Sequence, residues 1–262
     1  MPDNHAELLE GYKDISAILD KHQVRYYGMY GTALGAIRHS GFIPWDDDLD
    51  IAIRGEDLDI VNDILAKELD PEKYYYHIPS ADTHPHVIIK GPNFEEDLKN
   101  RRVTFIDIFL LLDSPDSAAR KALAYPFCGF ELLSHKIIDR TDSRMAKEVF
   151  YKLEHLSWKM IRFFSTPKTK IYGIRNVDVG GHTWRKELFG EPRPHEFEDI
   201  VMPIPNQCEK FLEETYGDYM TPPPEDQRSG ATGYPYSLMS DYLEDMAGSK
   251  KHRRMSREDL PY

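Results

Sequence analysis

The sequence predicts an α+β fold with a mixed sheet at its core and a helical C-terminal portion. Residues 48–53 alternate acidic and apolar side chains, and residues 102–112 form a long apolar run, so each segment is predicted to be a strand. Residues 116–165 have a helical pattern. Because strands and helices do not alternate regularly, the order of elements argues against a doubly wound dinucleotide-binding fold.

The first elements follow from apolar spacing. Leu8, Ile15 and Leu19 share one face of a predicted helix over 5–23. Aromatic and β-branched residues predict a strand over 24–30. A short helix is predicted over 32–39 with Thr32 near its start, and Pro44 prevents its continuation.

The remaining elements are read in the same way. Within 48–53, Leu49, Ile51 and Ile53 are expected on one face and Asp48 and Asp50 on the other. Apolar periodicity predicts a helix over 56–69, and Gly217 is expected to end a helix over 204–219. We expect strands at 73–78 and 86–90, a mixed region at 174–204 and an irregular segment after 219.

Composition limits the class of protein. The chain has 262 residues and a net charge of −12, which argues against a nucleic-acid partner because such partners need a basic surface. Its two cysteines, Cys128 and Cys208, are expected to be free thiols. The polar N-terminus is not a secretory signal, and a cytoplasmic location is predicted. The basic segment 250–257 is expected to be a solvated tail, with contact to an anionic membrane surface as the alternative.

Carboxylates are concentrated between residues 46 and 50. Two aspartates separated by one residue of a strand project to the same face, with Cα atoms roughly 6.5–7 Å apart. Asp107 stands alone in the apolar strand 102–112, where a buried carboxylate is costly unless it is paired or binds a metal. The pattern therefore predicts that Asp48, Asp50 and Asp107 bind Mg²⁺, with Mn²⁺ as an alternative. Asp46 is left open as an outer ligand, and Asp47 is expected to point away as a solvated or hydrogen-bonded turn residue.

A small turn precedes this acidic segment. Gly31 allows close backbone approach to an anion, and Thr32 lies at a helix N-terminus, which favours phosphate binding. Arg38 and His39 follow on the same short helix and can reach phosphate oxygens. An ordinary strand-to-helix turn with an N-cap is the simpler interpretation of Gly31 and Thr32.

The segment "GTALGAIRHSGFIPWDDDLDIAI" resembles the signature block of the LicD family, the phosphorylcholine transferases related to fukutin and fukutin-related protein. "VTFIDIFLLLD" resembles the second block of that family, and "YGDYMTPPPEDQR" (216–228) resembles the C-terminal block. The resemblance implies a nucleotidyltransferase-like core over 1–115, a region over 116–228 that completes the substrate cleft, and a loop-rich tail over 229–262. The histidine that usually follows the third block is absent from "SGATGYPYS".

The resemblance also implies site residues. Gly31 and Thr32 match the family's turn, Asp48 and Asp50 its acidic pair, and Asp107 its third acid. Arg38 matches the family arginine, and Arg228 falls in the third block, whose polar residues are expected to close over the donor. Lys90, at the end of a predicted strand, is expected either to hold a phosphate oxygen or to be an ordinary exposed lysine.

The implied reaction transfers a phosphorylated alcohol from a CDP-alcohol donor, CDP-choline above all, to a hydroxyl of a glycan or glycolipid acceptor such as lipopolysaccharide or a teichoic-acid precursor. Asp48 and Asp50 are assigned to the metal, and Asp107 is assigned to the metal and to the proton of the attacking hydroxyl. A choline headgroup favours an aromatic cage, for which the candidates are Trp45, Tyr30, Trp184, Tyr234 and Tyr236. Some relatives transfer ribitol phosphate, so the donor alcohol stays open.

Two other functions compete with this one. A nucleotidyltransferase that adds NMP to a small molecule would share the turn and the three acids, but the extended "RHSGFIPWDDDLDI" favours the LicD type. An inactive scaffold of the same fold is the non-enzyme alternative, and the intact Asp48, Asp50 and Asp107 argue against it.

Overall fold

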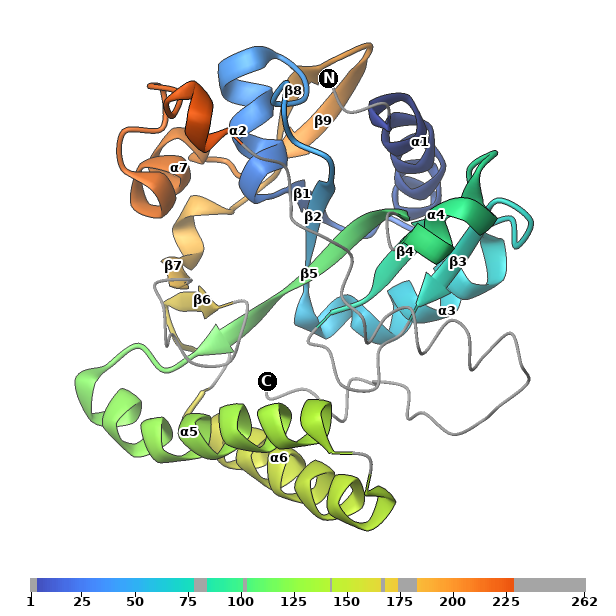
Figure 1. The fold of residues 1–262 in the computed structure, drawn as a ribbon. Helices are drawn as coiled ribbons and strands as arrows, with labels where there is room; N and C mark the ends of the chain where they lie inside the picture. Colours follow the sequence, from blue (N-terminus) through green and yellow to red (C-terminus); the bar gives the residue numbers. More distant parts are fainter. Residues whose placement is uncertain are drawn as a thin grey trace.

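The fold is built on a curled mixed sheet that helices cover (Figure 1). The computed structural model describes residues 4–77, 84–100, 103–141, 143–165, 168–173 and 183–228. In these residues the main sheet has the order β1-β2-β5-β4-β3, and β6 and β7 extend it from the far end of β5. β2 and β5 run parallel, whereas β1–β2, β4–β5 and β3–β4 are antiparallel. The predicted α+β class is confirmed.

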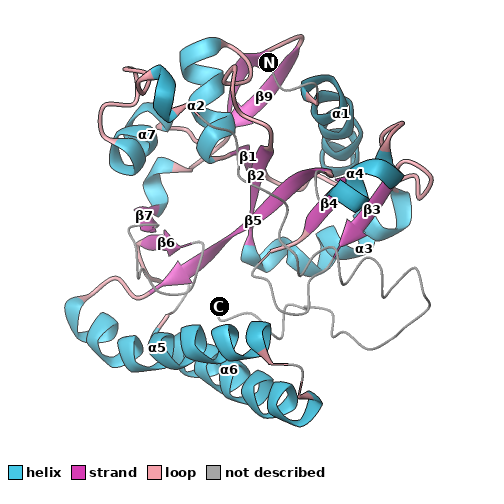
Figure 2. Cartoon of the chain, viewed as in Figure 1, coloured by secondary structure: helices cyan, strands magenta, loops and turns pink. Residues whose placement is uncertain are grey.

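Most predicted elements are present with shifted ends (Figure 2). The helices are α1 (His5–Lys21), α2 (Tyr30–His39), α3 (Leu58–Glu68), α4 (Phe94–Asn100), α5 (Ala118–Arg140), α6 (Arg144–Phe164) and α7 (Cys208–Tyr216). The strands are β1 (Tyr26–Gly28), β2 (Leu49–Arg54), β3 (Tyr74–His77), β4 (His86–Ile89), β5 (Thr104–Ser114), β6 (Ile171–Gly173), β7 (Thr183–Arg185), β8 (Arg193–Phe197) and β9 (Ile200–Ile204).

The differences from the predictions have local causes. The predicted strand 24–30 ends at Gly28, and α2 begins at Tyr30, because Tyr30 adopts a left-handed backbone conformation (φ 43°) that turns the chain sharply. The predicted helical region over 116–165 is confirmed and contains two helices, α5 and α6. The short helix α4 and strands β6 to β9 were not predicted individually, because elements of three to seven residues leave little periodicity to read.

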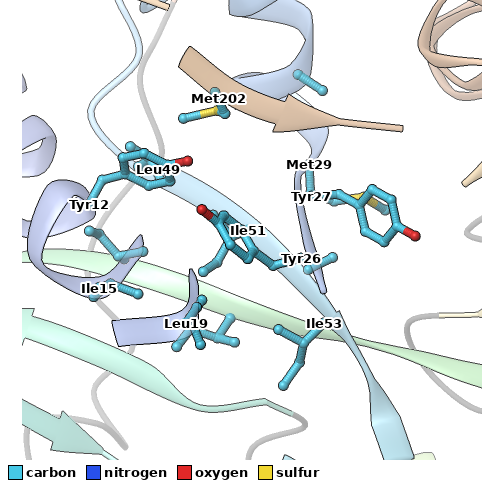
Figure 3. Close-up of a cluster of buried hydrophobic side chains, with 14 of the residues drawn as sticks. Tyr12, Ile15, Leu19, Tyr26, Tyr27, Met29, Leu49, Ile51, Ile53 and Met202 are labelled. Atoms are coloured by element: carbon cyan, nitrogen blue, oxygen red, sulfur yellow. The ribbon is translucent and has the colours of Figure 1, made fainter. Parts of the chain in front are cut away.

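One face of the sheet is closed by α1. Leu49, Ile51 and Ile53 of β2 point toward Tyr12, Ile15 and Leu19 of α1, and all six are buried (Figure 3). This confirms the predicted division of β2 into two faces. The same division runs along β5, where Ile106, Ile108 and Leu110 are buried and Phe105, Asp107 and Phe109 are partly exposed.

The main core also includes the C-terminal part of the described chain. Its buried residues extend from Leu8 to Leu212, so α7 and the β8–β9 hairpin pack with the N-terminal elements. Helices α5 and α6 form a hairpin with a small core of its own, made of Ala124, Cys128 and Ile161 (Figure 1), and Trp158 of α6 packs against the main core. The division at residue 115 stays a prediction. The tail 229–262 lies outside the described residues.

Glycine at position 35 lets α2 lie against the loop that follows it. A Cβ atom on Gly35 would lie 2.4 Å from the backbone oxygen of Gly41, which is too close for any real contact. A carbonyl cannot rotate away as a side chain can, so α2 and the loop would have to separate.

We expect Gly35→Ala to lower the free energy of unfolding by about 1–3 kcal/mol through this overpacking. The matched control is Gly129→Ala in α5, where an added Cβ meets nothing within 4 Å and better helix propensity should raise stability by up to about 1 kcal/mol. Urea unfolding of both variants measures the difference. Equal effects of the two substitutions would contradict this account of Gly35.

Candidate functional site

A row of polar side chains crosses the sheet on the face opposite α1. Asp50 of β2 pairs with Asp107 of β5, Asp107 pairs with His86 of β4, and His86 pairs with His77 of β3. Directly paired residues of neighbouring strands point to the same face of a sheet. The register therefore brings Asp50 and Asp107 together, although they are 57 positions apart in the sequence.

Asp48 and Asp46 join this row from the loop before β2. Oxygen atoms of Asp46, Asp47 and Asp48 lie within 4.8 Å of one another. Burial raises the pKa of Asp48 to about 8, and the charges of Asp46 and Asp107 add to the increase. Asp48 is therefore close to both the loop carboxylates and Asp107.

The carboxylates repel one another in the absence of a cation. Burial raises the pKa of Asp50 well above its ordinary value, and the charges of Asp48, Asp107 and Asp46 raise it further. The pKa of Asp46 is also raised, chiefly by burial. Raised carboxyl pKa values mark a place where negative charge has been gathered and buried at a cost to stability.

Asp107 has a different environment from the other acids. His86 Nδ1 lies 2.5 Å from Asp107 Oδ1, and His84 Nε2 lies 3.5 Å from the same oxygen. Burial alone would raise the pKa of Asp107, but the two imidazoles outweigh it and hold the pKa well below its usual range. Sequence reasoning missed both histidines, for which the only available signal was the spacing H-x-H at the start of a predicted strand.

The acidic loop is held by the start of α1. Asn4 Nδ2 donates to the backbone oxygen of Asp47 (2.7 Å), and His5 Nε2 lies 2.6 Å from the backbone oxygen of Asp46. A carbonyl oxygen only accepts, so His5 carries its proton on Nε2. The His5 ring also stacks on Phe42, with centroids 4.2 Å apart. The N-terminal helix thus fixes the loop, although it lies outside the sequence motifs.

The expectation that Asp47 points away is wrong. Its carboxylate lies with those of Asp46 and Asp48, and its Oδ1 is buried without a hydrogen-bond partner among the described residues. Alternation applies only to extended strands. β2 begins at Leu49, so Asp46, Asp47 and Asp48 belong to a turn that gathers all three side chains.

Gly31 and Thr32 lie beside the acids. Thr32 Oγ1 accepts a hydrogen bond from the backbone N–H of Asp50 (2.8 Å), which fixes β2 against the start of α2 and leaves the hydroxyl proton to donate. A Cβ atom on Gly31 would lie 2.6 Å from Asp46 Oδ2. In this structure, the anion that comes close to Gly31 is the carboxylate of Asp46.

Two arginines flank Trp45 at the edge of the cluster. The guanidinium carbon of Arg38 lies 6.0 Å from the Trp45 ring centroid, and that of Arg228 lies 4.8 Å from it. Arg38 Nη1 also donates to the backbone oxygen of Tyr219 (2.8 Å), and Arg228 Nε donates to that of Pro223 (2.9 Å). The first and third sequence blocks therefore meet here. Asp46 is close enough to influence the pKa of Arg38, which burial and Arg228 lower.

His39 and Lys90, which were also predicted to bind phosphate oxygens, have different surroundings from the two arginines. His39 makes an edge contact with Trp45 (centroids 6.2 Å apart), and burial and the charge of Arg38 lower its pKa. Lys90 donates to the backbone oxygen of Pro71 (2.8 Å). Lys90 lies four positions beyond His86 along β4, about 13 Å by strand rise, so the structure does not bring it to the carboxylates.

Tyr216 was not predicted as a site residue, although it begins the third sequence block. Burial raises the pKa of its hydroxyl, and so do the charges of Asp50, Asp46 and Asp48. Those charges place Tyr216 beside the cluster on the side of α7.

Of the aromatic residues predicted to form a cage for choline, some lie in the core and some are partly exposed. Trp184 is buried and its indole N–H donates to Thr215 Oγ1 (2.9 Å), so it belongs to the core. Tyr30 is partly exposed and contacts Phe109 edge-on, with ring centroids 5.1 Å apart. Phe109 shares its face of β5 with Asp107 and also contacts His84 (4.3 Å). Tyr234 and Tyr236 lie outside the described residues.

Fold and site together define an α+β domain with a partly buried carboxylate cluster. Carboxylate oxygens are what a hard divalent cation prefers, and the uncompensated charge of Asp48 and Asp50 fits Mg²⁺ or Mn²⁺. Asp107 lies opposite Asp50 as the third carboxylate, but it is already paired with His86 and His84.

Residues 23–127, which contain these acids, match the family described as "LicD/FKTN/FKRP, nucleotidyltransferase domain". This confirms the resemblance read from the sequence.

Similarity to one relative extends over most of the chain. The chain is 24% identical over 256 residues to the lipopolysaccharide cholinephosphotransferase LicD of Haemophilus influenzae, covering 87% of this chain and 92% of that protein. Uncharacterized proteins of Rickettsia prowazekii and Rickettsia typhi are each 53% identical over 45 residues. That segment is 17% of this chain, and 17% and 15% of the two rickettsial proteins.

The raised carboxylate pKa values predict how stability depends on pH in the metal-free protein. The pKa of Asp48 in the folded protein is above its value in the unfolded chain. The stabilisation that protonated Asp48 gives to the folded state is therefore fully present below about pH 4 and is lost as the pH rises through about 8. Asp48→Asn removes this charge. With about 1.4 kcal/mol per pKa unit as an upper limit, we expect the loss of stability between pH 5 and pH 9 to shrink by about 2 kcal/mol or more.

Urea unfolding in EDTA across this pH range measures the effect. Asp63→Asn is the matched control, since Asp63 is exposed on α3 and its substitution should leave the pH profile unchanged. If Asp48→Asn follows the wild-type profile as well, the acidic cluster is not repulsive.

Proposed function

We propose that this protein transfers the phosphorylated alcohol of a CDP-alcohol, with CDP-choline as the preferred donor, to a hydroxyl of a lipopolysaccharide-type glycan or glycolipid, and releases CMP. The observation that carries the proposal is the parallel pairing of β2 and β5, which brings Asp50 and Asp107 together within the LicD-family segment. Similarity to a cholinephosphotransferase over 87% of the chain supports the choice of alcohol and acceptor.

Asp48, Asp50 and Asp107 would hold Mg²⁺, or Mn²⁺ in its place. Bound there, the ion supplies positive charge that neutralises the donor diphosphate and stabilises the departing CMP. The raised pKa values of Asp48 and Asp50 support this assignment, because a cation offsets the repulsion that protonates them.

The chain's own residues orient the two substrates. Arg38 and Arg228 lie together at Trp45, where they can bind non-bridging phosphate oxygens. The start of α2 at Tyr30 and Gly31 presents backbone N–H groups next to the acids, which favours a phosphate there. Catalysis in phosphoryl transfer depends mainly on such positioning and charge stabilisation.

Asp107 is the group suited to the proton of the acceptor. Held ionised by His86 and His84, it would accept the proton as the acceptor oxygen bonds to the phosphorus of the phosphocholine group, although its lowered pKa makes it a weak base. The bond from that phosphorus to the bridging oxygen breaks, and CMP leaves with the electron pair.

The partly exposed rings of Tyr30 and Phe109 lie on the same face as Asp107 and form the surface that suits a quaternary ammonium group. A cytoplasmic location stays a prediction.

The decisive experiment offers the protein a panel of CDP-choline, CDP-ribitol and other CDP-alcohols with lipopolysaccharide-type acceptors and Mg²⁺, and identifies the products by mass spectrometry. We expect choline phosphate on the acceptor and free CMP. EDTA should abolish the transfer and added Mg²⁺ should restore it. Asp50→Asn and Asp107→Asn should each lower kcat by about 100-fold or more, whereas the control Asp63→Asn should keep the wild-type rate.

Other products would identify the competing functions. A nucleotide on the acceptor would indicate an NMP transferase. Ribitol phosphate on the acceptor would change only the identity of the donor alcohol in the proposal. Transfer that survives in Asp107→Asn would remove Asp107 from the reaction. If the affinity for the donor is the same with and without Mg²⁺, and the same in Asp50→Asn as in the wild type, the protein is an inactive scaffold.

A further inference from the structure

The α5–α6 hairpin exposes apolar side chains that a surface helix normally buries. Of the large apolar residues that are exposed in the described part of the chain, most lie on these two helices: Leu123, Tyr125, Phe130 and Leu133 on α5, and Met145, Val149, Leu153, Leu156 and Phe163 on α6. Met145 is 76% exposed and Phe163 is 75% exposed. The hairpin extends from the end of β5 (Figure 2), and Trp158 of α6 packs against the main core.

These residues form stripes at helical spacing. In α6, residues 145, 149, 153, 156 and 163 follow one line along the helix. The face that α6 turns inward includes Glu154 and Ser157 besides Ile161. Trp158 and Phe164 also pack inward, against the main core and the small hairpin core. The exposed stripe is therefore a second apolar strip of α6, outside the one that the fold buries.

The two stripes lie on one broad side of the hairpin. Leu123 comes one residue before the buried Ala124, and Leu153 and Leu156 come one residue before the buried Glu154 and Ser157. In both helices the stripe is therefore rotated by about 100° in the same sense from the inward face. Helices joined by a short connection run antiparallel, so the same rotation brings both stripes to the same side.

The charge of the hairpin differs from that of the rest of the chain. Residues 118–164 contain nine Lys or Arg and five Asp or Glu, a net charge of +4, in a chain whose net charge is −12. Lys152 and Lys159 are exposed next to the stripe of α6. Apolar stripes bordered by basic residues suit a helix that lies in the interface of an anionic membrane.

We propose that the broad apolar side of the α5–α6 hairpin, defined by Leu123, Phe130 and Leu133 of α5 and by Met145, Val149, Leu153, Leu156 and Phe163 of α6, binds the surface of an anionic membrane. The binding is peripheral: no helix of the described residues is long and apolar enough to cross a bilayer. The net positive charge of the hairpin favours a lipid surface with anionic headgroups and disfavours pairing with the same hairpin of a second copy.

The membrane-binding proposal rests on the proposed function, because it requires an acceptor that is anchored in a lipid. β5 carries Asp107 and leads directly into the hairpin, because Ser114 ends the strand and Ala118 begins α5. Asp107 lies seven residues before Ser114, roughly 23 Å along the strand. A membrane-bound hairpin would hold the carboxylates at a fixed distance from the lipid surface, within reach of a glycan that projects from it.

The test measures co-sedimentation of the full-length protein with vesicles of phosphatidylcholine alone and of an equimolar mixture with phosphatidylglycerol. We expect binding to the anionic vesicles. The double substitution Phe130→Glu and Leu156→Glu, at exposed positions, should weaken it at least tenfold. The matched control is Ile60→Glu with Val201→Glu, which adds the same charge at exposed positions of α3 and β9 and should bind like the wild type. Lys152→Gln and Lys159→Gln should each weaken binding about fivefold.

Three results would overturn the proposal. The first is no binding of the wild type to the anionic vesicles, or binding that the hairpin double variant retains. The second is a dimer in light scattering that the double variant abolishes, which would make a second copy the occupant. The third is faster proteolysis after residue 228 in the double variant, which would show that the chain's own C-terminal segment covers this side.

The outcome is separable from that of the proposed function. Vesicle binding needs no donor or acceptor, and Asp50→Asn should bind vesicles like the wild type. In the hairpin double variant, transfer to a water-soluble acceptor fragment should keep the wild-type rate while transfer to a vesicle-embedded glycolipid falls. If the double variant transfers to both acceptors at the wild-type rate, the hairpin has no part in transfer to membrane-embedded acceptors.

Discussion

The parallel pairing of β2 with β5 is the constraint on which the site depends. It sets Asp50 opposite Asp107 inside a sheet whose other face is filled by α1. Two ionised carboxylates at neighbouring positions of one sheet are unfavourable without a counter-charge. The imidazoles of His84 and His86 lower the pKa of Asp107, whereas burial and the neighbouring charges raise the pKa values of Asp48 and Asp50.

Much of the surrounding structure fixes these carboxylates in place. Thr32 holds the backbone of Asp50, while Asn4 and His5 hold the loop that carries Asp46 and Asp47. Glu198, from the β8–β9 turn, accepts from the backbone N–H of Phe42 (3.0 Å) at the start of that loop. Segments far apart in the sequence thus restrain one short acidic turn, so that the turn cannot relax to separate its charges.

The protein has two proposed binding surfaces, one for the donor at Trp45 and the carboxylates, and one for a membrane on the α5–α6 hairpin. The arginines at Trp45 and the carboxylates beside them suit a charged donor. The α5–α6 hairpin has only a small core of its own, so its apolar outer side contributes little to folding stability. Large exposed apolar patches on a protein surface mark contact surfaces, and the basic charge of the hairpin indicates the kind of partner.

The sequence by itself determined the fold class, the two main strands, the division of β2 into two faces and three of the carboxylates, because alternation and apolar spacing are local properties. It also carried the LicD resemblance. It could not show that His84 and His86 bind Asp107, that α1 holds the acidic loop, or that Lys90 lies far from the acids, since each depends on strand register or on contacts between distant segments. Asp47 was misjudged for the same reason: alternation holds in a strand, and only the tertiary structure decided that the strand begins at Leu49.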